Sequence, residues 1–233
     1  MNRILITASL VLTGCSPLLA DEFCNNEPVA IPDDSSAGVA VAISVDLPGE
    51  LVDALGVDLD VLHPWVGDLV VTLQSPGGTL VTLLDRPGTP SVGFPGPFGC
   101  GGANIFASFV DGAAQPAESM CSTTADPVVS GPVGPASPLG AFNGEPASGV
   151  WVLTVSDRSV YDAGVLNSVC LQVTGVAECA ADLNGDGQLD VFDVFGYLDL
   201  YAAQDPIADF TGDGQWDVFD VFAFLDVFNS GCP

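Results

Sequence analysis

The feature that most constrains this chain is a duplicated acidic loop near its C-terminus. The twelve residues 182–193 recur as residues 209–220, so that Asp209 follows Asp182 by 27 positions and Asp220 corresponds to Asp193. Each copy is followed by an apolar, aromatic segment of helical length. Repetition at a fixed spacing predicts one small unit that is built twice.

The side chains of both loops are of the kinds that bind calcium. Calcium takes six to eight oxygen ligands, and a twelve-residue loop supplies them from positions one, three, five, seven, nine and twelve. Gly187 and Gly214 occupy position six, where the chain must turn sharply. The sequence therefore predicts two Ca²⁺ ions, with main-chain carbonyls contributed at position seven. The predicted ligands are Asp182, Asn184, Asp186, Gln188, Asp190 and Asp193 in the first loop, and Asp209, Thr211, Asp213, Gln215, Asp217 and Asp220 in the second.

The loops are expected to depart from EF-hand geometry and to lead directly into helices. The twelfth residue is Asp, which is shorter than the bidentate Glu of the EF-hand. Helices are predicted to begin near Val191 and Val218, with the last Asp of each loop in the first turn. Leu189 and Trp216, at position eight, are predicted to point inward and to couple the two loops.

The apolar residues of the two predicted helices leave two interpretations open. One stripe at helical spacing on each helix is predicted to face the core. Phe192 and Phe219 lie off this stripe, so either all the aromatic residues pack the helices together or these two form a docking face. The stripe residues are Val191, Val194, Phe195 and Leu198, then Val218, Val221, Phe222 and Leu225.

Two loop-plus-exit-helix units without a preceding helix resemble the dockerin family over roughly residues 181–231. The resemblance implies a module that attaches a secreted protein to a partner or to a cell surface. In dockerins, the residues just before the last ligand help to select the partner. Here they are Val191-Phe192 and Val218-Phe219, unlike the hydroxyl pairs of well-known cohesin binders, so a partner other than a cohesin is expected.

The longer upstream part is predicted to be a β domain. The chain has 27 glycines and 18 prolines among 233 residues, which favours short strands joined by turns. Apolar residues alternate at 39–45 and at 55–61, and the segments 69–74 and 79–84 flank a Ser-Pro-Gly-Gly turn. Residues 151–155 and 164–174 complete the strands of an antiparallel sandwich or jelly roll. The Gly/Pro/Ser-rich segment 85–139 reads as a long loop, whose part 127–138 is either a disordered flap or functional.

Several segments of this part are similar to the P domain (Homo B domain) of proprotein convertases. They occur in the family's order across about residues 28–175 and begin with His63-Pro64-Trp65-Val66-Gly67-Asp68-Leu69. The resemblance implies a jelly-roll sandwich like the galactose-binding folds. The remaining segments are 73–79, 139–145, 149–155 and 157–166.

No catalytic residues are predicted. In convertases the P domain follows a subtilisin-like catalytic domain, and this sequence passes almost directly from an export signal into the β part. A Ser/His/Asp triad needs a base beside its nucleophile, but His63 is the one histidine and lies in the P-domain motif. An endopeptidase assignment would be inherited from the domain that P domains accompany. Asp68, Asp157 and Asp162 are predicted to cap turns or to hold a further calcium.

The N-terminus predicts export. Cleavage after Ala20 would release a soluble protein, and cleavage before Cys15 would leave a lipid-anchored one. An even set of six further cysteines suggests three disulfides in an exported chain. The pairing favoured by their positions is Cys24–Cys170, Cys100–Cys121 and Cys179–Cys232.

A net charge of −27, with three basic residues, excludes a nucleic-acid footprint and disfavours anionic lipid surfaces. The predicted organisation is a signal peptide at 1–20 (1–14 for a lipoprotein), a P-domain-like sandwich at 24–176 and a calcium module at 177–233. The predicted function is a secreted or cell-surface, non-catalytic protein that binds an extracellular partner through the calcium module. Assistance to a separate subtilisin-like protease is an alternative, and carbohydrate binding is a further one by fold analogy.

Overall fold

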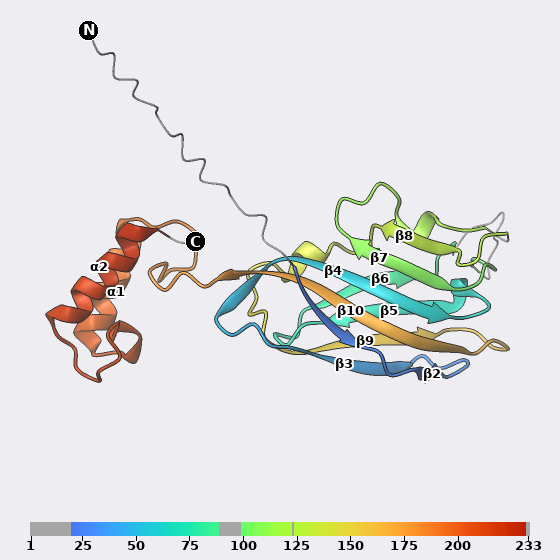
Figure 1. The fold of residues 1–233 in the computed structure, drawn as a ribbon, viewed down its shortest axis with the longest axis horizontal. Coiled ribbons are helices and arrows are strands. Elements are labelled where there is room, and N and C mark those ends of the chain that lie inside the picture. Colours follow the sequence, from blue (N-terminus) through green and yellow to red (C-terminus); the bar gives the residue numbers. More distant parts are fainter. Residues whose placement is uncertain (1–19, 89–98, 123, 232–233) are drawn as a thin grey trace, which may run out of the picture.

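The described chain forms ten strands up to Ala177, and two α-helices follow (Figure 1). The computed structural model describes residues 20–88, 99–122 and 124–231, so the predicted signal segment and Cys15 lie outside it. The strands are β1 (Asp21–Asn25), β2 (Val29–Ile31), β3 (Val39–Val45), β4 (Glu50–Leu62), β5 (Leu69–Gln74), β6 (Leu80–Asp85), β7 (Ile105–Val110), β8 (Val129–Val133), β9 (Gly149–Asp157) and β10 (Gly164–Ala177). The helices are α1 (Val191–Ala203) and α2 (Val218–Ser230), and short 3₁₀ turns are η1 (Val66–Asp68), η2 (Ala117–Ser119), η3 (Leu139–Phe142) and η4 (Pro206–Ala208).

The strands form a two-sheet β-sandwich. One sheet has the order β1-β10-β4-β7-β8, with β2 also paired to β10, and the other has the order β3-β9-β5-β6. The pairings are antiparallel except that of β7 with β8. The predicted alternation is confirmed, since the inward residues of β3, β4 and β9 are buried between the sheets. The predicted hairpin at 69–84 is also confirmed as β5 and β6.

The segment 85–139 was expected to be a loop, and the structure corrects this. Ile105, Ala107 and Phe109 alternate inward on β7, and β8 lies within the predicted flap. The composition conceals β8, because Gly131 and Pro132 are poor strand formers. Proline is tolerated there because β8 is the edge strand of its sheet. Along its outer edge, the main-chain N–H groups have no neighbouring strand to pair with.

Two of the three predicted disulfides are confirmed, Cys24–Cys170 and Cys100–Cys121. The first joins directly opposite residues of β1 and β10, and so holds an edge strand to its sheet. Cys179 is also disulfide-bonded, and its predicted partner Cys232 lies outside the described residues.

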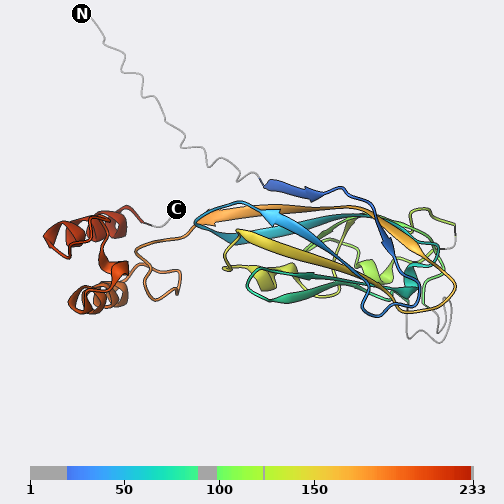
Figure 2. The ribbon, with the colours of Figure 1, turned by 90° about the horizontal axis from the view of Figure 1, so that it is seen from below.

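The helices lie beyond the end of β10 in both views (Figures 1 and 2). They have a hydrophobic cluster of their own, separate from the core of the sandwich, in which the rings of Tyr197 and Phe224 stack at 4.2 Å between centroids. Phe210 packs edge-on against both rings. Over the described residues, neither helix combines the length and hydropathy that crossing a membrane requires.

The predicted starts of both helices are confirmed, but the predicted core stripe is wrong. Of the stripe residues, only Val194 and Val221 pack against the cluster, and the other six are exposed. The buried face instead carries Asp193 and Tyr197 on α1, and Asp220 and Phe224 on α2. The last Asp of each loop must point inward to close its loop, and this requirement rotates the helix so that the apolar stripe turns outward.

Candidate functional site

Each predicted calcium loop folds as a closed turn in which the first Asp accepts hydrogen bonds from later residues of the loop. Asp182 Oδ1 accepts from the N–H groups of Gly185 and Asp186, at 2.9 and 3.2 Å, and its Oδ2 accepts from Gly187 at 2.7 Å. In the second loop Asp209 accepts from Asp213 at 3.2 Å and from Gly214 at 2.8 Å. The two loops therefore share one geometry, as their sequences predict.

The turn depends on the glycine at position six. Gly187 and Gly214 both have φ +77, in the left-handed region that residues with a Cβ rarely adopt. The next residue is Gln in each copy, and its N–H donates to the position-five Asp, at 2.9 Å in the first loop and 2.8 Å in the second. The chain thus reverses with the polar side chains of positions one and five already held.

The last Asp of each loop is fully buried and closes the turn. Asp193 Oδ1 accepts from Leu183 N–H at 3.0 Å, and its Oδ2 accepts from Asp190 N–H at 2.9 Å. Asp220 accepts from Asp217 N–H at 2.9 Å and from both the N–H and the hydroxyl of Thr211, at 3.0 and 2.9 Å.

These hydrogen bonds keep both buried carboxylates ionised. The Asp190 N–H lowers the pKa of Asp193, and the Asp217 N–H lowers the pKa of Asp220, in each case against the opposing effect of burial. The structure thus presents a negative charge at the inner end of each loop, where the helix begins.

The same carboxylates start the helices. Asp190 is the N-cap of α1 and accepts from Phe192 N–H at 2.7 Å, while the N–H of Asp190 donates to Asp193, which completes a capping box. Asp217 and Asp220 form the same arrangement at α2. Loop closure and helix initiation therefore use one set of groups.

The two loops meet through the shared cluster. Leu189 and Trp216, predicted to point inward, are partly buried against it. Trp216 Nε1 donates to the carbonyl of Asp205 at 2.8 Å, and the Tyr201 hydroxyl of α1 donates to the Trp216 carbonyl at 3.2 Å. Burial, together with the charge of Asp220, raises the pKa of Tyr197 to about 12, so its phenol remains protonated.

The donor set fits calcium by its chemistry. All the predicted side-chain ligands present oxygen, and a carboxylate that accepts N–H groups keeps further lone pairs for a cation. The carboxylates are spread along each turn instead of being packed together. Among the described residues, the one group of three acidic, cysteine or histidine side chains with ligand atoms within 4.8 Å is Glu22, Cys24 and Cys170, whose sulfurs form a disulfide.

The sequence left open whether the helices expose apolar residues, and the structure shows four large ones exposed on each helix. Phe192 and Phe219 have exposed fractions of 63% and 64%, and the neighbouring stripe residues are exposed as well. We call this surface the helix face; its residues are Val191, Phe192, Phe195, Leu198, Val218, Phe219, Phe222 and Leu225. The packing interpretation of these aromatic residues is therefore wrong. The signal that would have revealed the helix face is the need to bury Asp193 and Asp220.

His63 is buried in the sandwich, and both of its ring nitrogens are engaged. Nδ1 lies 2.9 Å from the carbonyl oxygen of Trp65, and Nε2 lies 3.2 Å from Asp157 Oδ2. Asp157 Oδ1 accepts from Ser159 N–H at 3.0 Å, so this carboxylate orients a backbone amide. The arrangement ties a loop to β9 and leaves His63 without access to solvent.

Asp68 is buried beside this pair and gives a prediction on pH. Burial, and then the charge of Asp157, raises the pKa of Asp68 from 3.8 to about 6. The folded state therefore binds this proton more tightly than the unfolded state, and stability falls as the pH rises from about 4 to about 6. Asp68→Asn should remove this fall, on the order of 1–3 kcal/mol, in urea unfolding monitored by tryptophan fluorescence. Asp46→Asn, at an exposed carboxyl, should retain it, and equal pH profiles for the two variants would contradict the assignment.

Comparison with known proteins finds one family model that matches part of the sandwich. Residues 52–94 match the family model of the proprotein convertase P-domain. The chain is 29% identical over 147 residues to leupeptin-inactivating enzyme 1 of Streptomyces exfoliatus, a match that covers 63% of this chain and 24% of that protein.

Solved structures give a weaker likeness. The serine protease of Aeromonas sobria matches with a TM-score of 0.37 and 18% identity, over 66% of this chain and 27% of that one. The complex of that protease with the chaperone ORF2 matches with a TM-score of 0.36 and 17% identity, over 66% and 27%. The chain thus spans about a quarter of the length of the proteins that it matches.

Proposed function

We propose that this chain is an exported, non-catalytic calcium-binding protein with a P-domain-like jelly-roll module and a dockerin-like attachment module. The single observation that carries the proposal is the pair of closed loops, in which a buried Asp both completes the turn and caps the following helix. The proposed modules are residues 24–176 and 177–233.

Two Ca²⁺ ions are proposed to bind these loops. A bound Ca²⁺ would neutralise the carboxylates of each loop and draw them together, within a chain of net charge −27. The side chains of positions one, three, five, nine and twelve and the carbonyl of position seven would hold each ion. The protein's own contribution is the turn, in which the first and last Asp of each loop accept main-chain N–H groups.

The helix face is proposed as the attachment surface. It presents equivalent exposed apolar residues on both helices, and exposed apolar patches mark interaction sites in soluble proteins. The proposed partner is an extracellular or cell-surface protein. Since the loops set the orientation of both helices through Asp193 and Asp220, attachment is proposed to require calcium.

A non-catalytic role is supported by the position of His63. Its ring is buried and directed at a backbone carbonyl and a carboxylate, so it is not available as a base for a serine nucleophile. The carboxylate neighbour serves to hold the loop in place.

Assistance to a separate subtilisin-like serine protease is the second candidate. It is favoured by the P-domain match at residues 52–94 and by the similarity to leupeptin-inactivating enzyme 1. A protease that co-purifies with this chain irrespective of calcium would favour assistance, whereas a surface protein released by chelator would favour attachment.

The attachment proposal predicts a large effect from charging the helix face. Phe192→Asp with Phe219→Asp should reduce calcium-dependent binding to the envelope of the exporting cells by at least tenfold, because two carboxylates would have to be desolvated in the contact. Binding is measured as the bound fraction of labelled protein. Leu80→Asp, at an exposed residue of β6, is the matched control and should bind normally. Undiminished binding by the double variant, with its helices intact, would refute the proposal.

A further inference from the structure

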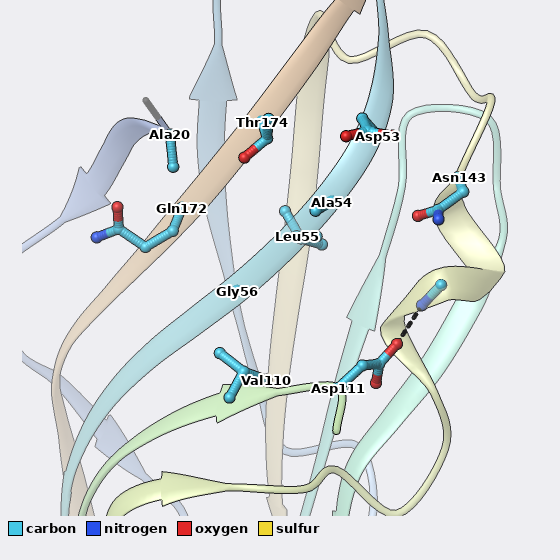
Figure 3. Close-up of a pocket in the computed structure, with 11 residues that line it drawn as sticks. Ala20, Asp53, Ala54, Leu55, Gly56, Val110, Asp111, Asn143, Gln172 and Thr174 are labelled. Carbon is cyan, nitrogen blue, oxygen red and sulfur yellow. Dashed lines mark hydrogen bonds between the residues drawn. The ribbon is translucent and has the colours of Figure 1, made fainter. Parts of the chain in front are cut away.

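Two hollows lie end to end along β4 on the outer face of the six-stranded sheet. The first, of about 370 Å³, is lined at β4 by residues 53–56 (Figure 3), and the second, of about 250 Å³, by residues 58–60. The walls continue on both neighbouring strands, with residues between 168 and 174 of β10 on one side, and residues between 106 and 110 of β7 with Asp111 after it on the other. The two hollows follow one another along β4 and are separated by the hydrogen bond from Gln172 to Asp58; we call them together the outer groove.

The groove exists because β4, the middle strand, has small or absent side chains at the floor of the first hollow. Gly56 lies between Gln172 of β10 and Val110 of β7, which are its partners in the two ladders (Figure 3). Ala54 lies beside Thr174 in the same way. The register of β4 with β10 shifts next to these residues, and such an irregularity re-aims side chains.

The second hollow has a fixed polar lining. Asp58 accepts from the Ser108 hydroxyl and from Gln172 Nε2, the latter at 3.2 Å. Asp60 accepts from Asn167 Nδ2, also at 3.2 Å. These contacts fix the carboxylates and leave lone pairs on them for further donors.

One aromatic ring stands at the end of the groove. Phe106 is 66% exposed on β7, directly across the ladder from Asp60, which is in turn opposite Ser168 of β10. An exposed aromatic ring in the middle of a sheet surface is unfavourable in water and does not contribute to the core. Beside a carboxylate and a hydroxyl it provides a flat apolar platform with hydrogen-bonding groups at its edge.

We propose that the outer groove binds an uncharged polysaccharide chain. Its lining has carboxylate, amide and hydroxyl groups and no Lys or Arg among the residues that the structure places there, so an anionic ligand would be repelled. Sugar hydroxyls donate to such acceptors, and the apolar face of a sugar ring packs on an aromatic ring. The span from Asp53 to Asp60 is roughly 23 Å, which suits a chain of several sugar units better than a single one.

The position of the groove argues against an extended peptide as the ligand. Peptides that bind sheets add to an edge, where free main-chain groups are available. β4 is flanked by β10 and β7, so its main-chain groups are already paired, and contact is made by side chains alone. This inference goes beyond attachment through the helix face and does not depend on it.

The test is binding of the full chain to an array of neutral, uronic-acid and sulfated oligosaccharides of increasing length, together with a lysine-rich peptide. A neutral oligosaccharide should bind, with affinity rising from disaccharide to longer chains in calorimetric titration. Phe106→Ala should weaken binding at least tenfold. Leu80→Ala, which removes a comparably exposed apolar side chain (61%) from the other sheet, should not change it.

A second variant blocks the floor without disturbing the sheet. A Cβ at Gly56 would lie 3.4 Å from Val110 Cγ1 and 3.5 Å from Gln172 Cβ, which is ordinary contact. Gly56→Thr should therefore keep its melting temperature, since β-branched residues suit strands, and should lose binding. Chelator should have no effect on oligosaccharide binding, which separates this result from that of the attachment proposal. Absence of binding to every neutral oligosaccharide, or undiminished binding by both variants, overturns the proposal, and so does selective binding of the peptide.

Discussion

The variant Asp182→Ala with Asp209→Ala is expected to lose most of the helical signal of α1 and α2 while the β-sandwich remains folded. Each Asp accepts N–H groups from positions five and six of its loop, and each is a predicted calcium ligand. An ion present at a hundred times its dissociation constant stabilises the folded state by about 2.7 kcal/mol per site. The loss is measured by far-UV circular dichroism in calcium buffer, and uptake by calorimetric titration.

The matched control is Asp199→Ala with Asp226→Ala. These aspartates occupy equivalent exposed positions on α1 and α2, so the control makes the same change in charge outside the loops. It should retain both the helices and the uptake of two ions. Chelator should remove the helical signal of the unmodified protein, as the loop substitutions do, and should leave the sandwich folded. If the unmodified protein takes up no calcium, the ions have no part in this fold.

Loss of the Cys24–Cys170 disulfide is expected to be the largest single destabilisation of the sandwich. The two cysteines are separated by 146 residues, and the chain-entropy model assigns about 5 kcal/mol to a loop of that length. Cys24→Ala with Cys170→Ala should lower the free energy of unfolding by about this amount, measured in guanidinium. β1 should also exchange its amide hydrogens faster, because Phe23 is its one side chain that packs against the core.

A single Cys24→Ala variant separates the effect of losing the disulfide from the effect of replacing both cysteine side chains. It removes the same bond, and its partner cysteine is only half-buried, so it should cost nearly as much as the double variant. A single variant as stable as the unmodified protein would show that the bond does not constrain the unfolded chain.

The sandwich could largely be predicted from the sequence because strand alternation is a local property. In β4, the residues Leu55, Val57, Leu59 and Val61 face the core at every second position, and the pattern is unbroken. The edge strand β8 could not be predicted in this way. Its Gly131-Pro132 pair has no strand propensity, and what holds it is parallel pairing with β7, a contact between distant segments.

The start of each helix directly after its acidic loop could be predicted from the sequence, but the orientation of the helices could not. Apolar periodicity placed Phe195 and Phe222 in the core. The hydrogen bonds of Asp193 and Asp220 to backbone N–H groups outweigh that preference, because a buried ionised carboxylate must keep its partners. A polar group can thus set the face of a helix, which hydrophobic patterning does not anticipate.

The outer groove had no sequence signal at all. In the sequence, Gly56 and Ala54 are only residues of low strand propensity. The cross-strand register places larger side chains around them, those of Gln172, Val110 and Thr174. Register is set by three strands together, and its effect on surface shape emerges only in the assembled sheet.

The Pro132 that interrupts β8 has a consequence for how copies of the protein behave in a crowded medium. An unpaired strand edge invites a strand of another molecule to add to it, and proline, which has no N–H, denies that strand one of its anchor points. At the opposite rim of the same sheet, β1 is five residues long and begins with Asp21-Glu22, so an approaching strand meets negative charge, and β2, which continues this rim, has only three residues to pair with. Both rims of the larger sheet therefore discourage fibre-like stacking, and the protein can reach high local density without polymerising through this sheet.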